Sequence, residues 1–139
     1  MSDLVRFSVS IPADLAETFD ALILRKGYQS RSEAIRDVMR DYFVEREWDN
    51  SHSDVVGTVT IIYNHESSEL GQTLTELQHH HHERIICTTH IHLDEHNCLE
   101  VIIVKGQSDE IQNIADKLIS MKGVKHGKLV CTTTGHNLS

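Results

Sequence analysis

The sequence predicts an α+β chain with two parts: a short strand–helix–helix segment and a larger domain of the ferredoxin-like βαββαβ kind. Two observations support this prediction. Apolar residues recur with a period of two in some segments and with a helical period in others, and the two kinds follow a fixed order. A polar stretch then separates the parts, so we expect one domain over residues 1–48, a linker over 49–54 and a second domain over 55–139.

The first expected element is a strand over residues 5–11, Val-Arg-Phe-Ser-Val-Ser-Ile. Its apolar residues occupy one face, and Arg6, Ser8 and Ser10 occupy the other. Pro12 ends the strand, because proline cannot donate to a ladder of hydrogen bonds. The polar face is equally compatible with a solvated surface and with a two-stranded ribbon, built from two chains, that enters the major groove of DNA.

Two helices are expected next. Apolar residues at helical spacing fill residues 15–23, and Gly27 marks the end of that helix. Ser30 then opens a second helix as a capping box with Glu33, and its apolar stripe continues to Phe43. One strand and two short helices cannot bury a sufficient core alone. We therefore expect two chains to pair here as an obligate dimer.

The second domain is expected to alternate strands and helices in the order βαββαβ. The strands are predicted over residues 55–63, 85–93, 98–105 and 124–132, and the helices over residues 70–77 and 108–119, the latter capped by Ser108 and ended by Gly123. In this arrangement the helices cover one face of the sheet. The other face is then either solvated or covered by another subunit.

Composition limits the possible functions. The net charge is −8 with neutral histidines, which counts against a bulk basic patch for nucleic acid but leaves local arginines to act. No apolar stretch is long enough to span a bilayer, and residues 1–11 lack the apolar core of a signal peptide, so we expect a cytoplasmic protein. Cys87, Cys98 and Cys131 are odd in number and widely spaced, which favours free or metal-bound thiols over disulfides.

Seven of the eleven histidines lie between residues 79 and 96. The strongest signal there is the pattern His90-x-His92 followed five residues later by Cys98. Residues i and i+2 of a strand share a face, so the two imidazoles point to one side and Ile91 to the other, toward the helices. Two imidazoles and a thiolate on a bare sheet face would suit a first-row transition metal. The alternative to a metal site is a pair of surface histidines with a cysteine that lies nearby by chance.

A run of four histidines, His79 to His82, follows the predicted helix over residues 70–77. Consecutive histidines point in different directions, so only one or two of them can serve one site. One such ligand would complete a His₃Cys set, which suits tetrahedral zinc as well as square-planar Ni(II) or Cu(II). Such a set leaves no open position or general base, which argues against a hydrolytic enzyme. A metal-storage protein would also explain the histidine run, and an antitoxin-type repressor would also explain the strand–helix–helix segment.

Two further features have structural interpretations. Cys87 shares its strand face with Ile91 and Leu93, so we expect a small buried hydrophobe there. Glu33 and Asp37 lie one helical turn apart, and such a pair can hold a hard cation. The residues alone favour a solvated, ion-paired helix face for these two carboxylates, because several arginines lie nearby on the same helix.

Over nearly the whole chain these features resemble one family. The resemblance lies in the N-terminal strand and in the segments GYQSRSEAIRDVMRDYF, QHHHHE, HIHLDEHNCLE and VKHGKL. Together they are similar to the nickel-responsive regulators (NikR), which are ribbon-helix-helix repressors with an ACT-like C-terminal domain. The resemblance implies a repressor of nickel uptake genes and no enzyme. It also implies one Ni(II) per subunit, a palindromic operator in double-stranded DNA, and a homotetramer built as a dimer of dimers.

The resemblance also implies a metal site. His90, His92 and Cys98 match three ligands that one subunit supplies, and His79 matches the fourth, which comes from a neighbouring subunit. In the family this site is square-planar Ni(II) with a deprotonated cysteine. The sequence leaves open whether the remaining histidines of this region form weaker secondary sites: His65, His80, His81, His82 and His96.

Two more sets of residues receive roles from the resemblance. Arg6, Ser8 and Ser10 match the positions of the strand that contact DNA bases, with serine where the family often has threonine. Glu33 and Asp37 match a cation site between the two domains, for K⁺ or another hard cation, that forms in DNA-bound states.

Overall fold

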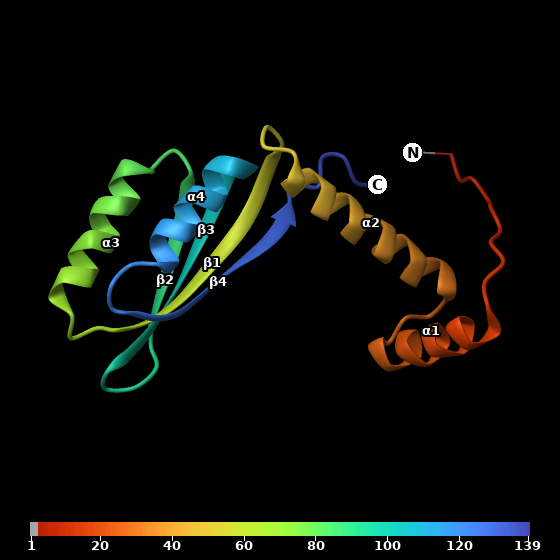
Figure 1. Ribbon diagram of the computed structural model, residues 1–139, viewed down its shortest axis with the longest axis horizontal. Coiled ribbons are helices and arrows are strands. Elements are labelled where there is room, and N and C mark those ends of the chain that lie inside the picture. Colours follow the sequence, from red (N-terminus) through yellow and green to blue (C-terminus); the bar gives the residue numbers. More distant parts are fainter. Residues whose placement is uncertain (1–2) are drawn as a thin grey trace. The chain divides into compact units, whose positions relative to one another are not determined.

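The computed structural model describes residues 3–139. Its elements (Figure 1) are α1 (Ala13–Lys26), α2 (Arg31–Asp49), β1 (Asp54–Asn64), α3 (Ser68–His80), β2 (Ile85–His92), β3 (Asn97–Gln107), α4 (Ser108–Ile119) and β4 (Val124–Thr133). The chain forms two compact units, one holding the residues up to Phe43 with Asn137–Ser139 and the other holding Val44–His136. None of the helices in the described part of the chain is long and apolar enough to cross a membrane.

Helix α1 follows Pro12 and ends at Lys26, directly before Gly27, the residue that the sequence predicts as its end marker. Gly27 has a φ of +84°, a left-handed conformation that glycine adopts without the penalty a Cβ would bring. The amide of Gly27 donates to Leu24 O, and the amide of Tyr28 donates to Ile23 O, both at 3.1 Å. These two hydrogen bonds are the Schellman arrangement that satisfies the last carbonyls of a helix.

The predicted capping box opens α2. The amide of Glu33 donates to Ser30 Oγ at 3.2 Å. The carboxylate of Glu33 accepts a hydrogen bond from the amide of Gln29, also at 3.2 Å, rather than from the amide of Ser30. Both side chains therefore accept hydrogen bonds from backbone amides at the start of the helix. The Glu33 carboxylate binds the amide of Gln29, one residue before the Ser30 amide that a capping box would use.

Residues 3–12 belong to no helix or strand in this single chain, so the strand predicted over residues 5–11 has no ladder here. A strand needs a neighbour to accept its backbone hydrogen bonds, and the sequence assigns that neighbour to a second chain. The apolar residues of this segment are exposed, from 45% at Ile11 to 89% at Leu4. Their alternation is unchanged, but nothing in the described chain buries them.

The second unit is a four-stranded antiparallel sheet in the order β2-β3-β1-β4. This is the strand order of the predicted ferredoxin-like arrangement. Helices α3 and α4 lie on one face of the sheet (Figure 1), and their apolar residues join those of β1 and β3 in one core. Central members of this core are Val59, Ile61, Leu74, Ile102, Ile111 and Leu118.

The start of α4 differs from the prediction. The N-cap is Gln107, without a side-chain cap, and Ser108 is the first residue of the helix. The hydroxyl of Ser108 donates instead to Asn50 O at 2.6 Å, and its amide donates to Ser53 O at 3.1 Å. Ser108 is buried against the turn before β1, so it fastens that turn to α4 rather than capping the helix.

The strand register also corrects the predicted direction of the β2 side chains. His92 pairs with Cys98, and Cys98 pairs with Tyr63 of β1, which belongs to the core beneath the helices. Directly paired residues of neighbouring strands share a face, so His90 and His92 lie on the helix-covered face. The prediction that they occupy a bare face while Ile91 and Leu93 point toward the helices is wrong.

Cys87 follows the same correction. It pairs with Ile103 on the helix-free face and is exposed, so the predicted buried position is wrong. The physical reason is that both faces of this sheet contain apolar residues. On the helix-free face these include Ile91, Leu99, Val101 and Ile103, so hydrophobicity alone did not distinguish the two sides of β2.

Candidate functional site

Two of the predicted metal ligands form a cross-strand pair. His92 ends β2 and Cys98 lies directly opposite on β3, with Nδ1 of the imidazole 3.3 Å from the sulfur. Cys98 is fully buried, whereas His92 is exposed. The thiol therefore lies at the base of the site and the imidazole at its open side. A soft sulfur donor beside an imidazole is a donor pair that first-row transition metals bind well.

His90 lies on the same face and is held by hydrogen bonds. Its Nδ1 lies 3.0 Å from the hydroxyl of Tyr63, which donates to Glu100 Oε2 at 3.0 Å. Because the single phenolic proton goes to the carboxylate, Nδ1 of His90 must itself donate to the Tyr63 oxygen. In the neutral imidazole, this hydrogen bond leaves Nε2 of His90 as the nitrogen that can bind a metal. The rings of His90 and His92 are 4.9 Å apart between centroids.

The network beneath His90 reaches helix α3. Glu100 is only 7% exposed, and its Oε1 accepts a hydrogen bond from Gln78 Nε2 at 3.1 Å. Burial, followed by the negative charge of Glu100, raises the pKa of the Tyr63 hydroxyl well above its usual value. Tyr63 therefore stays protonated and keeps donating. The sequence prediction missed this chain of three residues, whose signal was the odd occurrence of a glutamate in the apolar pattern of β3.

His79, the predicted fourth ligand, lies elsewhere in the single chain. It follows Gln78 on the last turn of α3 and lines a shallow hollow with Ile86 and Cys87 of β2. The structure therefore places three of the four predicted ligands on one face of the sheet, with His92 against Cys98 and the ring of His90 beside that of His92. His79 lies apart from the contact between His92 and Cys98. The sequence resemblance places the fourth ligand in a neighbouring subunit, and that assignment stays a prediction.

A different histidine lies beside the cross-strand pair. The ligand atoms of His65, His92 and Cys98 all lie within 4.8 Å of one another, and no other such group of three is found among residues 3–139. His65 follows β1 in the segment that leads to α3. The sequence prediction left its role open. The available signal was its position two residues beyond Tyr63, at the end of the strand that neighbours the strand of Cys98.

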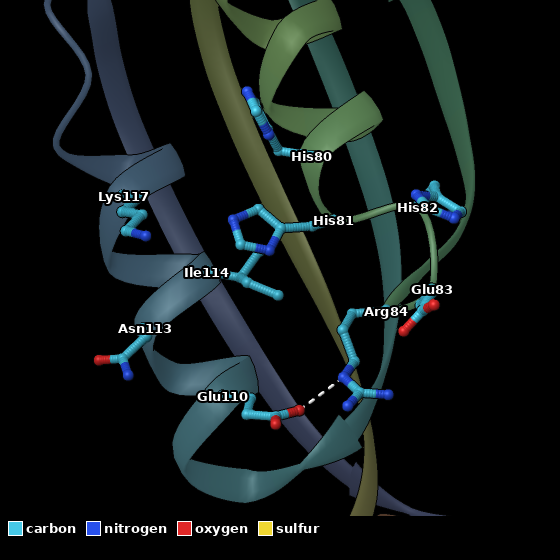
Figure 2. Close-up of a pocket in the computed structure, with 9 residues that line it drawn as sticks. All are labelled: His80, His81, His82, Glu83, Arg84, Glu110, Asn113, Ile114 and Lys117. Atoms are coloured by element: carbon cyan, nitrogen blue, oxygen red, sulfur yellow. Dashed lines mark ion pairs between the residues drawn. The ribbon is translucent and has the colours of Figure 1, made fainter.

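The rest of the histidine run lines a separate hollow. His80, His81 and His82 surround a cavity of about 500 Å³ between the end of α3 and α4 (Figure 2). Arg84, ion-paired with Glu110, and Lys117 also line it. Burial, and then the positive charge of Lys117, lower the pKa of His81, which favours its neutral form. Glu83 and Glu110 balance the charges of Arg84 and Lys117 in this lining, so charge alone does not mark the hollow as a metal site.

The carboxylates of the predicted cation site already have partners. Asp37 accepts hydrogen bonds from the Tyr28 hydroxyl at 2.7 Å and from Arg40 at 2.9 Å. The hydrogen bond from Tyr28, and then that from Arg40, lower the pKa of Asp37. Glu33 accepts from the Gln29 amide. These contacts are the ion-paired helix face that the residues alone favour, and a cation would have to compete with them.

The predicted DNA-contacting residues lie in the segment before α1. Arg6, Ser8 and Ser10 are all exposed there, and none of them makes a described side-chain contact that would occupy its polar atoms. Their side chains are therefore accessible to a ligand in the single chain.

Comparison with known protein families divides the chain into two matches. Residues 56–132 match the family model described as the NikR C terminal nickel binding domain. Residues 5–46 match the model described as ribbon-helix-helix protein, copG family. The two matches cover the elements that hold the predicted metal ligands and the segment that holds the predicted DNA contacts.

Relatives of nearly the same length are more than half identical. A protein of Pyrococcus abyssi is 56% identical over 136 residues, covering 98% of this chain and 99% of that protein. A protein of Pyrococcus horikoshii is 54% identical over 136 residues, with the same coverage of 98% and 99%. One from Trichlorobacter lovleyi is 56% identical over 133 residues, or 96% of each chain. All three bear the provisional name nickel-responsive regulator.

Among solved structures, the uncharacterized protein TM1266 from Thermotoga maritima is similar with a TM-score of 0.51 and 21% identity. The likeness covers 58% of this chain and 99% of that one. At this identity the likeness is one of fold alone.

Proposed function

The chain belongs to the family of nickel-responsive regulators, and from that premise we propose that it is a repressor that binds its operator when nickel is bound. As a member of this family it is a DNA-binding regulator with a nickel-binding domain and not an enzyme. The observation that supports the proposal best is the placement of His90, His92 and Cys98 on one face, with the sulfur 3.3 Å from an imidazole nitrogen.

In the proposed site, His90, His92 and Cys98 hold one Ni(II) per subunit together with His79 of a neighbouring subunit. Cys98 supplies the anionic sulfur, buried at the base of the site. Tyr63 fixes the tautomer of His90, so that Nε2 is ready to coordinate. Bound nickel would supply a preference for a planar set of four donors, and His79 of a neighbouring subunit would supply the fourth of them.

We further propose that the assembly is a homotetramer, a dimer of dimers. In the unit that holds α1, the only buried apolar side chains are Ile23 and Ala34 among the described residues, while Phe7, Val9 and Phe43 are exposed. Pairing of two such units would bury these side chains and give the segment over residues 5–11 its missing strand neighbour. The apolar helix-free face of the sheet offers a second surface for association.

For DNA, we propose that Arg6, Ser8 and Ser10 of paired strands contact base edges in the major groove of a palindromic operator that controls nickel uptake genes. Guanidinium and hydroxyl groups are suited to base edges, and a two-fold symmetric protein matches two-fold symmetric half-sites. Glu33 and Asp37 would hold K⁺ or another hard cation in the DNA-bound state. That step requires Asp37 to exchange its contacts with Tyr28 and Arg40.

The test is operator binding by the full chain, metal-free and with one nickel per chain, with zinc as the comparison metal. DNA from its own upstream region and from a nearby transporter promoter serves as the probe. Strong binding with nickel alone is the expected result. Tight nickel uptake without metal-dependent DNA binding would instead indicate a storage or chaperone protein.

The ligand set is tested by a matched pair of cysteine variants. Cys98→Ala removes the buried sulfur and should abolish high-affinity nickel binding. Cys87→Ala changes an exposed thiol on the helix-free face and should leave nickel affinity unchanged. Loss of nickel in both variants, or in neither, would contradict the proposed set.

A further inference from the structure

We propose that three residues outside the ligand set position the nickel ligands: Asp94, Asn97 and Lys125. Together they form a brace that fixes the β2–β3 hairpin in the register in which His92 lies against Cys98. The effect of the brace on nickel affinity rests on the proposed function. The brace itself belongs to the metal-free chain, so it can be measured without nickel.

The turn between these two ligands is held by the side chain of Asp94. Residues 93–97 separate the ligands in the chain. Asp94 Oδ1 accepts hydrogen bonds from the amides of His96 and Asn97, at 2.8 and 2.7 Å. An aspartate that accepts the amide two residues ahead forms an Asx-turn, which fixes the backbone locally. The backbone closes the same turn, because the amide of Leu93 donates to Asn97 O at 2.8 Å.

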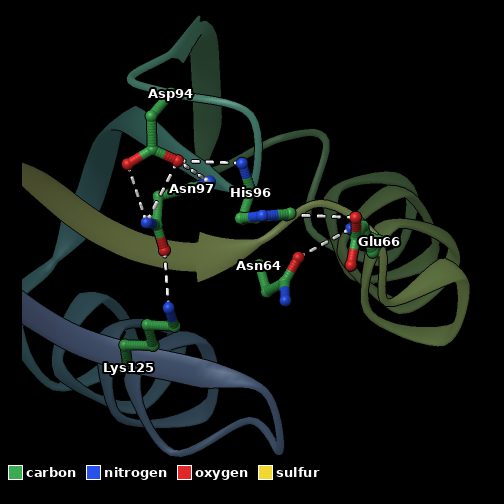
Figure 3. A network of polar contacts seen from close by, with 6 residues as sticks. All are labelled: Asn64, Glu66, Asp94, His96, Asn97 and Lys125. Atoms are coloured by element: carbon green, nitrogen blue, oxygen red, sulfur yellow. Dashed lines mark hydrogen bonds and ion pairs between the residues drawn. The ribbon is translucent and has the colours of Figure 1, made fainter.

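The side chain of Asn97 connects this turn to another strand. Its Nδ2 donates to Asp94 Oδ2 at 2.9 Å, and its Oδ1 accepts from Lys125 Nζ at 2.6 Å (Figure 3). An amide held at both its donor and its acceptor cannot rotate without losing a hydrogen bond. The residue directly before Cys98 is therefore fixed from two directions.

A β-bulge places Lys125 where it can reach the hairpin. Ile62 pairs with His126, but the next residue, Tyr63, pairs with Val124, so Lys125 is the extra residue of β4. A bulge interrupts the ladder and redirects the side chain of its extra residue, and bulges are common beside functional sites. Because β1 lies between β3 and β4, the Lys125 side chain crosses the end of β1 to meet the hairpin.

The opposite side of the turn is tied to the segment that follows β1. The carbonyl of His96 accepts from the amide of His65 at 3.0 Å. Nδ1 of His96 lies 3.1 Å from Glu66 Oε1, and the amide of Glu66 donates to Asn64 Oδ1 at 2.9 Å (Figure 3). The hairpin is therefore fastened to β1 and to β4, and Lys125 supplies the contact with β4.

A brace of this kind raises affinity because it reduces what metal binding has to order. Cys98 is buried, whereas His92 is exposed, so the position of the imidazole depends on the hairpin that carries it. A ligand held in place before the metal arrives loses less conformational freedom on binding. Loss of a group that supports a ligand costs about 10- to 100-fold in metal affinity.

The first test measures the nickel affinity of the full chain by competition with a chelator. Asp94→Ala removes both acceptor oxygens of the turn and should weaken nickel binding by about 10- to 100-fold. Glu95→Ala removes an exposed carboxylate from the same turn and should leave the affinity unchanged. Asp94→Asn keeps one oxygen for the two turn amides, so it should recover part of the loss. Equal affinities in Asp94→Ala and Glu95→Ala would overturn the proposal.

Lys125 is tested against another lysine of β4. Lys125→Met removes the donor, keeps the length of the side chain, and should weaken nickel binding by about 3- to 10-fold, as expected for one hydrogen bond. Lys128→Met makes the same change of charge at an exposed position of that strand and should have no effect. Because both contacts converge on Asn97, the loss in Asp94→Ala/Lys125→Met should be smaller than the product of the single losses. Equal affinities in the two lysine variants would contradict the brace.

Amide hydrogen exchange of the metal-free protein separates the brace from the nickel site. The amides of Leu93 and Asn97 should exchange faster in Lys125→Met than in Lys128→Met, because the turn opens more often without its contact to β4. Equal exchange rates in the two variants would overturn the proposal. Unchanged nickel affinity in Cys98→Ala would count against the proposed nickel site alone, because the exchange measurement would still stand.

Discussion

At the scale of single residues, the hydrogen bond that orients His90 depends on where the phenolic proton of Tyr63 goes. The hydroxyl of Tyr63 lies between Nδ1 of His90 and Oε2 of Glu100, each 3.0 Å away. Its raised pKa keeps the proton on the oxygen, and the buried carboxylate accepts it. The orientation of His90 is thus set by a group outside the proposed ligand set, which is a common arrangement at metal sites.

Tyr63→Phe tests this arrangement. The variant keeps the ring in the core and removes the hydroxyl, so His90 loses its hydrogen-bond acceptor and Glu100 keeps only Gln78. Nickel affinity should fall by about 10- to 100-fold, as for other supporting groups. The measurement is competition with a chelator, and Thr75→Ala, which removes an exposed hydroxyl from α3, is the control. Equal nickel affinities in the two variants would show that Tyr63 is a packing residue only.

A second residue-scale prediction concerns the ion pair between α1 and α2. Arg31 donates to both carboxylate oxygens of Asp20, at 2.7 and 2.6 Å. These hydrogen bonds, more than the charge itself, lower the pKa of Asp20 below its ordinary value of 3.8. The stabilisation from this pair is therefore present above about pH 4 and is lost as the pH falls through the lower folded value.

Arg31→Ala should return the pKa of Asp20 toward 3.8. Titration of the side-chain carboxyl carbon by NMR measures it directly, in the wild type and in the variant. Arg36→Ala, which leaves both hydrogen bonds in place, is the matched control. A wild-type carboxyl that titrates at its ordinary value would mean that the pair does not form in solution.

At the scale of elements, α3 links the core to the proposed intersubunit ligand. Gln78 on its last turn donates to buried Glu100, and His79 is the next residue. Earlier in the same helix lies Gly71, and a Cβ added there would meet nothing within 4 Å. Glycine inside a helix costs stability relative to alanine, so the sequence leaves α3 less stable than its packing permits.

Gly71→Ala should therefore stabilise the protein by up to about 1 kcal/mol. Gly127→Ala is the contrasting variant, because its Cβ would lie 2.7 Å from Ile119 Cγ1 and 3.1 Å from Ile61 Cγ2. Overpacking of this kind costs about 1–3 kcal/mol. Chemical denaturation of the metal-free protein measures both. Destabilisation by Gly71→Ala would show that a partner not present in the single chain contacts this position.

The elements that the sequence predicts well are those whose signals are local. The Ser30 cap and the helical and strand periods of residues 13–133 depend on neighbours a few residues away, and the structure has them. The strand predicted over residues 5–11 is the exception, because its pairing partner is not part of the single chain. Ser108 was assigned wrongly because its hydroxyl bonds to Asn50 O, a partner far away in the sequence. The direction of Ile91 depends on the register with β3, and the proximity of His65 to Cys98 depends on which strands are neighbours. Neither is encoded in a local pattern.

At the scale of the whole molecule, one chain leaves two apolar surfaces uncovered. The side chains of Val5, Phe7 and Val9 are all more than half exposed, and on the helix-free face of the sheet Val130 is 52% exposed. Apolar surface of this extent favours association. If copies of the chain associate through both surfaces, the two interfaces can be coupled. A ligand that stabilises one interface changes how the subunits are arranged when the other interface forms.

This coupling gives the last prediction. If His79 and the set around Cys98 come from different subunits, then nickel binding fixes the arrangement of the C-terminal domains, and operator binding fixes the arrangement of the N-terminal ones. Linkage requires that each ligand tighten the other by the same factor, about 5- to 150-fold for typical allosteric proteins. Nickel titrations with and without excess operator, and operator titrations with and without nickel, measure the two factors independently. Identical nickel affinity in the presence and absence of operator would rule out the coupling. His79→Ala should reduce both factors toward one, while Cys87→Ala, which changes an exposed thiol outside the proposed ligand set, should leave them equal to those of the wild type.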